Sequence, residues 1–120
     1  MRTSEKILNP SLKKEILRTF CQTIADLKDA EEADVFFNDF LTDTEYEAFA
    51  KRLAIAYWLK KGRSYNNIKD NLKVSSATIA SVQQVMDKEG FKLGVKKMEA
   101  EEWANQWSEK IKNFVKKRQE

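Results

Sequence analysis

Side chains that could contact nucleic acid gather in one short region of the sequence. They are Asn66, Lys69, Lys73, Ser75, Ser76, Ala77, Thr78 and Ala80. Lysine and asparagine side chains are suited to phosphate oxygens. Serine and threonine hydroxyls can bond either donors or acceptors on a base edge, and an alanine methyl can touch the methyl of thymine. The chemistry open to these residues is therefore recognition of double-stranded DNA.

The apolar residues in this region have the spacing of a helix-turn-helix. Over residues 65–84, that pattern places apolar side chains at the fourth, eighth, tenth, fifteenth and eighteenth positions. The matching residues are Ile68, Leu72, Val74, Ile79 and Val82. We predict a helix-turn-helix over 64–87, with a first helix at about 64–72 and a recognition helix at about 75–87.

Two residues depart from the usual pattern. The fifth position is often alanine and here is Lys69, and the turn often has glycine and here has Lys73. A lysine in a left-handed turn costs roughly 1 kcal/mol, which a folded domain can tolerate. A plain helical hairpin would also show apolar residues four apart, so the spacing leaves that alternative open.

Further helices are predicted ahead of this region. Asn9 as N-cap and Pro10 in the first turn favour a helix start. The apolar spacing extends this helix over 10–28. A short acidic helix is expected near 31–40. The region before residue 42 is therefore predicted to be helical.

A long helix is predicted to support the helix-turn-helix. Thr42 and Glu45 match a capping box, and Gly62 ends the helix they open at about residue 61. The second half of this helix is apolar nearly all round, which is typical of a helix buried on several sides. We expect it to lie at the centre of the core.

The C-terminal region is predicted to hold one more helix. Gly90 and Gly94 favour a basic connection over 88–97, and a last helix is expected over 98–118. Its apolar face consists of Trp103, Trp107, Ile111, Phe114 and Val115. The apolar faces within 10–61 and 98–118 fit an intramolecular core and a dimer interface equally well.

Composition limits the kinds of site the chain can build. Its 120 residues suggest one domain, 1–120, with a small core, which oligomerisation often completes. Histidine is absent and Cys21 is the single cysteine, so the usual zinc ligand sets cannot form. No nucleophile–base pair or glycine-rich phosphate loop is readable. We expect no metal, no cofactor and no enzymatic activity.

The charge is divided sharply along the chain. Residues 26–50 hold nine acidic side chains and one basic one, whereas residues 51–97 hold eleven basic and three acidic ones. A basic block favours phosphate-rich partners, although a solvated charged surface would look the same. Residues 1–9 lack the apolar region of a signal peptide, and no stretch is apolar enough to span a membrane. We expect a soluble, cytoplasmic protein with no membrane association.

From residue 40 onward the chain resembles the tryptophan repressor superfamily. The pattern consists of Leu41-Thr42-x-x-Glu45, Ala50-x-Arg52, a long apolar helix ending in Gly62, Ser64-Tyr65-x-x-Ile68 and Thr78-Ile79. The YerC/YecD-type branch, in which G-x-S-Y-x-x-I is typical, is the most similar. The resemblance implies an all-α, six-helix fold and an intertwined homodimer. It also implies a sequence-specific transcriptional regulator that binds duplex DNA, usually a repressor.

The resemblance further implies an effector pocket at Leu41, Thr42, Arg52 and Ser81. The arginine that stacks on the ligand in the family is replaced by Ser81, and the glycine beneath the ring by Val82. These changes remove a cationic wall and crowd the slot, so L-tryptophan is not expected to be the co-repressor. Thr42 as an N-cap and Arg52 as a surface cation are alternative roles. A helical protein–protein interaction module without DNA binding is the alternative function.

Overall fold

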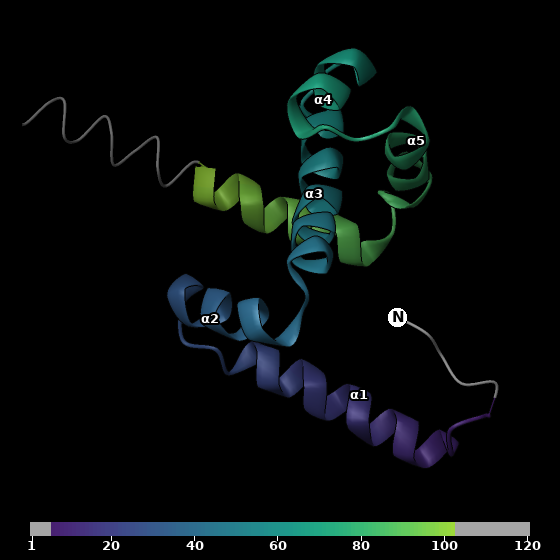
Figure 1. The fold of residues 1–120 in the computed structure, drawn as a ribbon, viewed down its shortest axis with the longest axis vertical. Coiled ribbons are helices and arrows are strands. Elements are labelled where there is room, and N and C mark those ends of the chain that lie inside the picture. The colour runs from purple at the N-terminus through teal and green to yellow at the C-terminus, as the bar shows by residue number, and fades with distance from the viewer. Residues whose placement is uncertain (1–5, 103–120) are drawn as a thin grey trace, which may run out of the picture. The chain divides into compact units, whose positions relative to one another are not determined.

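The computed structural model describes residues 6–102, and every regular element within them is a helix (Figure 1). The labelled helices are α1 (Pro10–Ala25), α2 (Ala30–Phe40), α3 (Asp43–Lys60), α4 (Tyr65–Leu72) and α5 (Ser76–Val85). A sixth helix covers residues 89–102, up to the limit of the described residues. The predicted all-α, six-helix class is therefore confirmed. The chain forms two compact units, Met1–Tyr46 and Glu47–Glu120.

The boundaries of α1 follow from side chains that cap its ends. The Asn9 Oδ1 accepts hydrogen bonds from the backbone N–H of Ser11 at 2.9 Å and of Leu12 at 3.2 Å, as an N-cap should. The helix ends at Ala25, three residues before the predicted end at 28. The reason is that Asp29 is already the N-cap of α2, where its carboxylate accepts the N–H of Glu32 at 2.9 Å.

Aromatic side chains hold the N-terminal unit together. Phe20 of α1 lies 5.7 Å from Phe40 of α2 between ring centroids, and Phe36 stacks on Phe40 at 5.0 Å. The Tyr46 Oη donates a 2.7 Å hydrogen bond to Asp34, which raises the pKa of Tyr46 above its usual value. No residue of α1 or α2 is buried.

The long helix α3 begins and ends as its sequence predicts. The Thr42 Oγ1 accepts the N–H of Glu45 at 3.1 Å, and the Glu45 carboxylate accepts the N–H of Thr42 at 2.9 Å, so the capping box is confirmed. At the other end, Gly62 has a φ of 83°. The N–H of Gly62 bonds the Leu59 carbonyl, and the N–H of Arg63 bonds the Trp58 carbonyl. These two bonds form a Schellman motif.

The core of the C-terminal unit is small and draws on four helices. Its buried residues are Ile55, Ala56, Ile68, Ile79, Val82 and Val95. Two of them, Ile55 and Ala56, come from α3, against which α4, α5 and the helix over 89–102 pack. The predicted central place of the long helix is confirmed for this unit.

The prediction of a basic connection over 88–97 is wrong, because a helix begins at residue 89. Glycine disfavours a helix interior by roughly 1 kcal/mol, but packing outweighs that preference here. Val95 is 4% exposed, and Phe91 packs against the core. A Cβ added at Gly94 would lie 2.9 Å from Leu53 Cδ1, so this glycine lets the helix approach α3 closely.

The aromatic face predicted for the last helix lies outside the described residues. Of the range 98–118, the structure describes residues 98–102, and these continue the helix that begins at 89. Within residues 6–102, no helix combines the length and apolar character needed to cross a membrane.

Candidate nucleic-acid interface

The two helices α4 and α5 pack against each other and against the core through the apolar residues of the predicted pattern. Ile68 of α4 and Ile79 of α5 are fully buried, and Val82 is 4% exposed. Leu72 and Val74 pack against the same core. All five apolar residues of the predicted pattern therefore do the packing that the pattern requires.

Serine side chains define where each of the two helices begins. The Ser64 Oγ accepts the N–H of Asn67 at 3.1 Å, which caps α4. The Ser75 Oγ accepts the N–H of Thr78 at 3.1 Å, which caps α5. Of the two serines at the start of this helix, Ser75 is the N-cap and Ser76 is the first helical residue. The second helix ends at Val85 rather than 87, because a turn at Met86 and Asp87 leads into the next helix.

The turn between the helices is made by a lysine in a left-handed conformation. Lys73, the C-cap of α4, has φ 55° and ψ 52°. Among the described residues it is the single non-glycine residue with a positive φ. The predicted left-handed turn at Lys73 is therefore confirmed.

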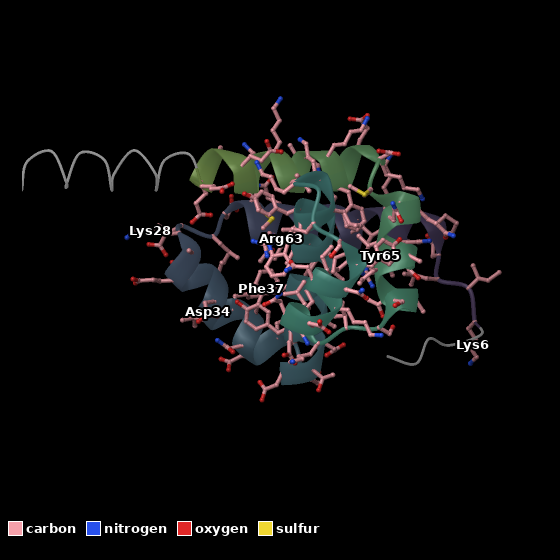
Figure 2. The ribbon with its side chains drawn as sticks, turned by 90° about the horizontal axis from the view of Figure 1, so that it is seen from above. Lys6, Lys28, Asp34, Phe37, Arg63 and Tyr65 are labelled. Atoms are coloured by element: carbon pink, nitrogen blue, oxygen red, sulfur yellow. The ribbon has the colours of Figure 1, made fainter. Side chains whose placement is uncertain are left out.

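A hydrogen bond joins the two helices outside the core. Tyr65, at the first position of α4, donates its hydroxyl hydrogen to the side-chain oxygen of Gln83 on α5. Figure 2 labels Tyr65 and Arg63 near the start of α4. The Arg63 guanidinium lies 4.0 Å from the centroid of the Trp58 ring and donates to the Asn67 Oδ1 at 3.4 Å. These contacts hold the start of α4 against the end of α3.

The predicted DNA-contacting residues are accessible on α4, on α5 and at the turn between them. Asn66 and Lys69 are exposed on α4, and Lys73 is exposed at its end. On α5 and its cap, Ala80 is half-buried and the others are exposed, namely Ser75, Ser76, Ala77 and Thr78. The fold therefore presents both predicted sets, the phosphate-type residues and the base-type residues, to a partner.

Several hydroxyls of this region already have partners within the protein. The Oγ of Ser75 and the Oγ1 of Thr78 are 2.9 Å apart and share a hydrogen bond. The Ser81 hydroxyl donates to the Ala77 carbonyl at 3.0 Å. The hydroxyls of Ser75 and Thr78 could therefore contact a base only through the donor or acceptor positions that their shared hydrogen bond does not use.

A cavity of about 490 Å³ opens between α3 and the helix-turn-helix. Its lining consists of three cations, three hydroxyl residues and three small apolar residues: Lys51, Arg52, Lys73, Ser75, Thr78, Ser81, Ala48, Val74 and Val82. Two of the predicted effector residues, Arg52 and Ser81, are brought together here. The cavity can therefore offer positive charge and hydroxyl groups to an anionic ligand.

The other two predicted effector residues have structural roles within the N-terminal unit. Leu41 is the C-cap of α2, and Thr42 forms the capping box with Glu45. Hydrogen bonds from the Thr42 backbone and side chain lower the pKa of Glu45. The alternative reading of Thr42 as an N-cap is therefore confirmed.

Lys51 and Arg63 are cations near the site that the sequence pattern did not single out. Lys51 lines the cavity with Arg52 and lies 3.4 Å from Glu47 in an ion pair. The spacing of Ala48, Lys51 and Arg52 places all three on one side of α3, a signal that could have identified Lys51. Arg63 carried no comparable signal, because its contact with Trp58 depends on the turn at Gly62.

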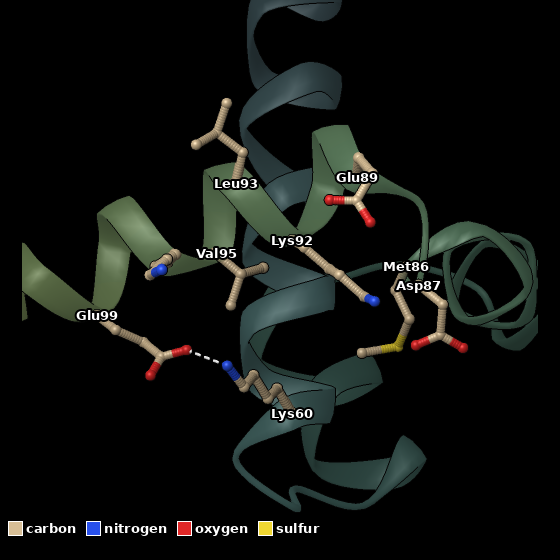
Figure 3. Close-up of a pocket in the computed structure, with 9 residues that line it drawn as sticks. Lys60, Met86, Asp87, Glu89, Lys92, Leu93, Val95 and Glu99 are labelled. Atoms are coloured by element: carbon tan, nitrogen blue, oxygen red, sulfur yellow. Dashed lines mark hydrogen bonds and ion pairs between the residues drawn. The ribbon is translucent and has the colours of Figure 1, made fainter.

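A second cavity, of about 630 Å³, lies between the end of α3 and the helix over 89–102 (Figure 3). Lys60 of α3 donates to the Glu99 carboxylate at 2.5 Å, which lowers the pKa of Glu99. Met86 and Val95 supply apolar lining. The ion pair ties two helices together, so these charges act within the fold. Among the described residues, no group of three or more histidine, cysteine, aspartate or glutamate side chains is placed to hold a metal.

Comparison with known proteins identifies the family. The model for the family described as Trp repressor protein matches residues 15–99. The chain belongs to the Trp repressor protein family. It is 36% identical over 74 residues to the uncharacterized protein YerC of Bacillus subtilis (strain 168), which covers 62% of this chain and 70% of YerC. The predicted YerC-type, Trp-repressor-like identity is confirmed.

Two crystal structures share the fold of this family member. A TrpR-like protein from Eubacterium eligens ATCC 27750 superimposes with a TM-score of 0.68 at 29% identity, covering 75% of this chain and 95% of that one. A candidate Trp repressor from Staphylococcus aureus superimposes with a TM-score of 0.67 at 25% identity, covering 78% and 96%. The Trp-repressor-like fold is therefore established for this chain.

Proposed function

We propose that this Trp-repressor family member is a sequence-specific transcriptional regulator that binds duplex DNA through α4 and α5. Repression is the mode that the family's name suggests. The observation that carries the proposal is the buried packing of Ile68, Ile79 and Val82, which leaves the opposite side of α5 accessible. Such an accessible helix face is what the major groove admits.

The charge around the turn supports the same proposal. Lys69 and Lys73 are exposed beside the start of α5, and Lys51 and Arg52 line the neighbouring cavity. Cations placed around a recognition helix neutralise backbone phosphates and supply most of the affinity. The base-facing part of α5 is made of small residues, which permit close approach to base edges.

A homodimer is the second part of the proposal. Apolar side chains on α1 remain 41–54% exposed in the single chain, and they are Leu12, Ile16, Leu17 and Phe20. A second copy of this chain is the occupant we assign to this face, because the family resemblance implies a dimer and the single chain buries few residues. Two copies would present two α5 helices to successive turns of the major groove.

Independence from L-tryptophan is the third part. Val82 stands where the resemblance places a glycine beneath the ligand ring, and this valine is 4% exposed within the core. Ser81 replaces the stacking arginine and donates its hydroxyl to the Ala77 carbonyl. A rise in melting temperature on addition of L-tryptophan would contradict this part, since a ligand that binds the folded state stabilises it.

The salt dependence of duplex binding tests DNA recognition directly. Affinity for selected duplex DNA should fall about a hundred-fold between 50 and 200 mM salt if several phosphates are contacted. Replacing Lys69 and Lys73 together by alanine should weaken all duplexes alike and flatten the slope. The matched control replaces Lys13 and Lys14, two exposed lysines of α1, and should leave affinity nearly unchanged.

Several results of these binding experiments would contradict the proposal. Binding that stays flat with salt, or equal effects of the two lysine pairs, would exclude DNA docking through α4 and α5. If no duplex bound at low salt and a stoichiometric protein partner were captured instead, the interaction-module alternative would replace the proposal.

A further inference from the structure

The polar side chains of α5 fall into two groups, those with partners inside the protein and those without. Thr78 bonds Ser75, Ser81 bonds the Ala77 carbonyl, and Gln83 bonds Tyr65. Of the side chains of α5, those of Ser76 and Gln84 make no hydrogen bond or ion pair with the described residues. These two side chains keep their full bonding capacity for a partner.

Gln84 lies on the side of α5 that faces away from the core. It follows Ala77, Ala80 and Ser81 at spacings of seven, four and three residues, which places all four on one face of a helix. Ile79 and Val82 occupy the buried side. The outward face therefore consists of small residues with one long, exposed amide at its far end.

The side chain of glutamine has the chemistry to identify one base. Its carbonyl oxygen and NH₂ group can pair with the N6 donor and N7 acceptor of adenine in the major groove. The alanines at 77 and 80 let the helix approach the groove floor along its length. Ser76 and Gln84 are about 12 Å apart along the helix axis at 1.5 Å per residue, which corresponds to roughly three to four base pairs.

We propose that Gln84 is a specificity-determining residue that reads an adenine, with α5 lying lengthwise in the major groove. This inference rests on the proposed DNA binding through α4 and α5. It extends the predicted base contacts from the first turn of α5 to its last turn. Each half-site should contain an adenine that Gln84 selects, three to four base pairs from the base nearest Ser76.

Selection from a random duplex library, with the full-length protein and its variants, tests this assignment. The wild-type protein should enrich a motif, and Gln84→Ala should lose the preference at one adenine per half-site while retaining the other positions. Discrimination at that base pair should fall about ten-fold or more. Gln84→Glu should shift the preference at that position toward cytosine, whose N4 donor a carboxylate accepts.

The neighbouring glutamine provides a matched control. Gln83→Ala removes the same side chain one position away and breaks the bond to Tyr65, so it should lower thermal stability and leave the selected motif unchanged. If Gln84→Ala kept the whole motif, or if Gln83→Ala lost the adenine in its place, this inference would be overturned and DNA binding would stand. If the wild-type protein enriched no duplex, the proposed function would fail and this inference with it.

Discussion

Lys73 combines a strained backbone with a useful charge. Its left-handed conformation, at φ 55°, is one that glycine adopts without steric cost. The lysine side chain, however, is exposed beside the start of α5 and lines the cationic cavity. Lys73 therefore disfavours the folded state through its backbone conformation and favours DNA binding through its charge.

Replacing Lys73 by glycine should separate the effect on stability from the effect on DNA binding. Lys73→Gly should raise the free energy of unfolding by about 1 kcal/mol, because glycine has no Cβ that makes the left-handed conformation unfavourable. The same substitution should weaken duplex DNA binding, because one cation near the phosphates is lost. Chemical denaturation and a binding titration measure the two quantities. As a control, Lys69→Ala should weaken binding without stabilising the fold, and a stabilised Lys73→Gly with unchanged affinity would remove Lys73 from the interface.

At the scale of elements, the helix over 89–102 contains two glycines that differ in their surroundings. A Cβ at Gly94 would lie 2.9 Å from Leu53 Cδ1, whereas a Cβ at Gly90 would meet no atom within 4 Å. Glycine weakens a helix interior wherever no contact requires it. The sites therefore predict opposite responses to a larger side chain.

Substitutions at Gly90 and at Gly94 should change the stability of the protein in opposite directions. Gly90→Ala should stabilise the protein by about 0.5–1 kcal/mol through helix propensity. Gly94→Leu should destabilise it by about 1–3 kcal/mol, because the larger side chain overpacks the contact with α3. Thermal and denaturant unfolding of both variants measure the difference. Equal stabilisation at the two positions would show that the helix does not approach Leu53 in solution.

The capping box of α3 predicts a pH dependence. Hydrogen bonds from Thr42 lower the pKa of Glu45 below its usual value of 4.5. A carboxyl whose pKa is lower in the folded state stabilises that state above the unfolded pKa, and the contribution disappears as the pH falls through the folded pKa. The melting temperature of the wild type should exceed that of Glu45→Gln at pH 7, and the gap should close below pH 4.5. A gap that stays constant into acid would assign the difference to another cause.

At the scale of the whole molecule, the exposed apolar face of α1 is the surface that we propose a second copy of the chain covers. Ile16, 49% exposed in the single chain, lies on this face with Leu12 and Phe20. Ile16→Glu should convert the dimer to a monomer and reduce DNA affinity, because a buried charge at an interface is costly and two half-sites can no longer be held together. Sedimentation equilibrium measures the mass of each form. Ser11→Glu adds the same charge on the polar side of α1, where the exposed Ser11 side chain makes no hydrogen bond with the described residues, and should leave the dimer intact.

Much of the fold could be predicted from local sequence. Three residues, Asn9, Thr42 and Gly62, act at helix ends through their own side chains or backbone freedom. Their roles could be predicted without knowledge of distant contacts. The five apolar residues of the helix-turn-helix pattern could also be predicted, because the same spacing places them on one face of each helix and in the core. Their prediction as a packed pair of helices is confirmed by the burial of Ile68, Ile79 and Val82.

Other features depended on contacts far apart in the sequence. Local preference alone made Gly90 and Gly94 signals for a break, but packing against Leu53 and the core kept residues 89–102 helical. The bond between Tyr65 and Gln83 joins residues 18 apart, and no spacing rule predicts it. Gln83, Thr78 and Ser81 have partners within the protein, whereas the Gln84 side chain has none among the described residues. Tertiary structure was needed to show this difference.

The sequence by itself therefore determined the apolar spacing of the helix-turn-helix pattern and the lysines and small residues beside it, because these depend on residue type and short-range spacing. The family resemblance identified Ser81 and Val82 as the positions where the arginine and the glycine are replaced. Tertiary structure decided which side chains of α5 are already bonded, that Lys51 joins Arg52 in one cavity, and that residues 89–102 form a helix after a short turn. The physical reason is that hydrogen bonds and close packing between helices depend on where the chain returns in space, and short-range spacing does not record that position.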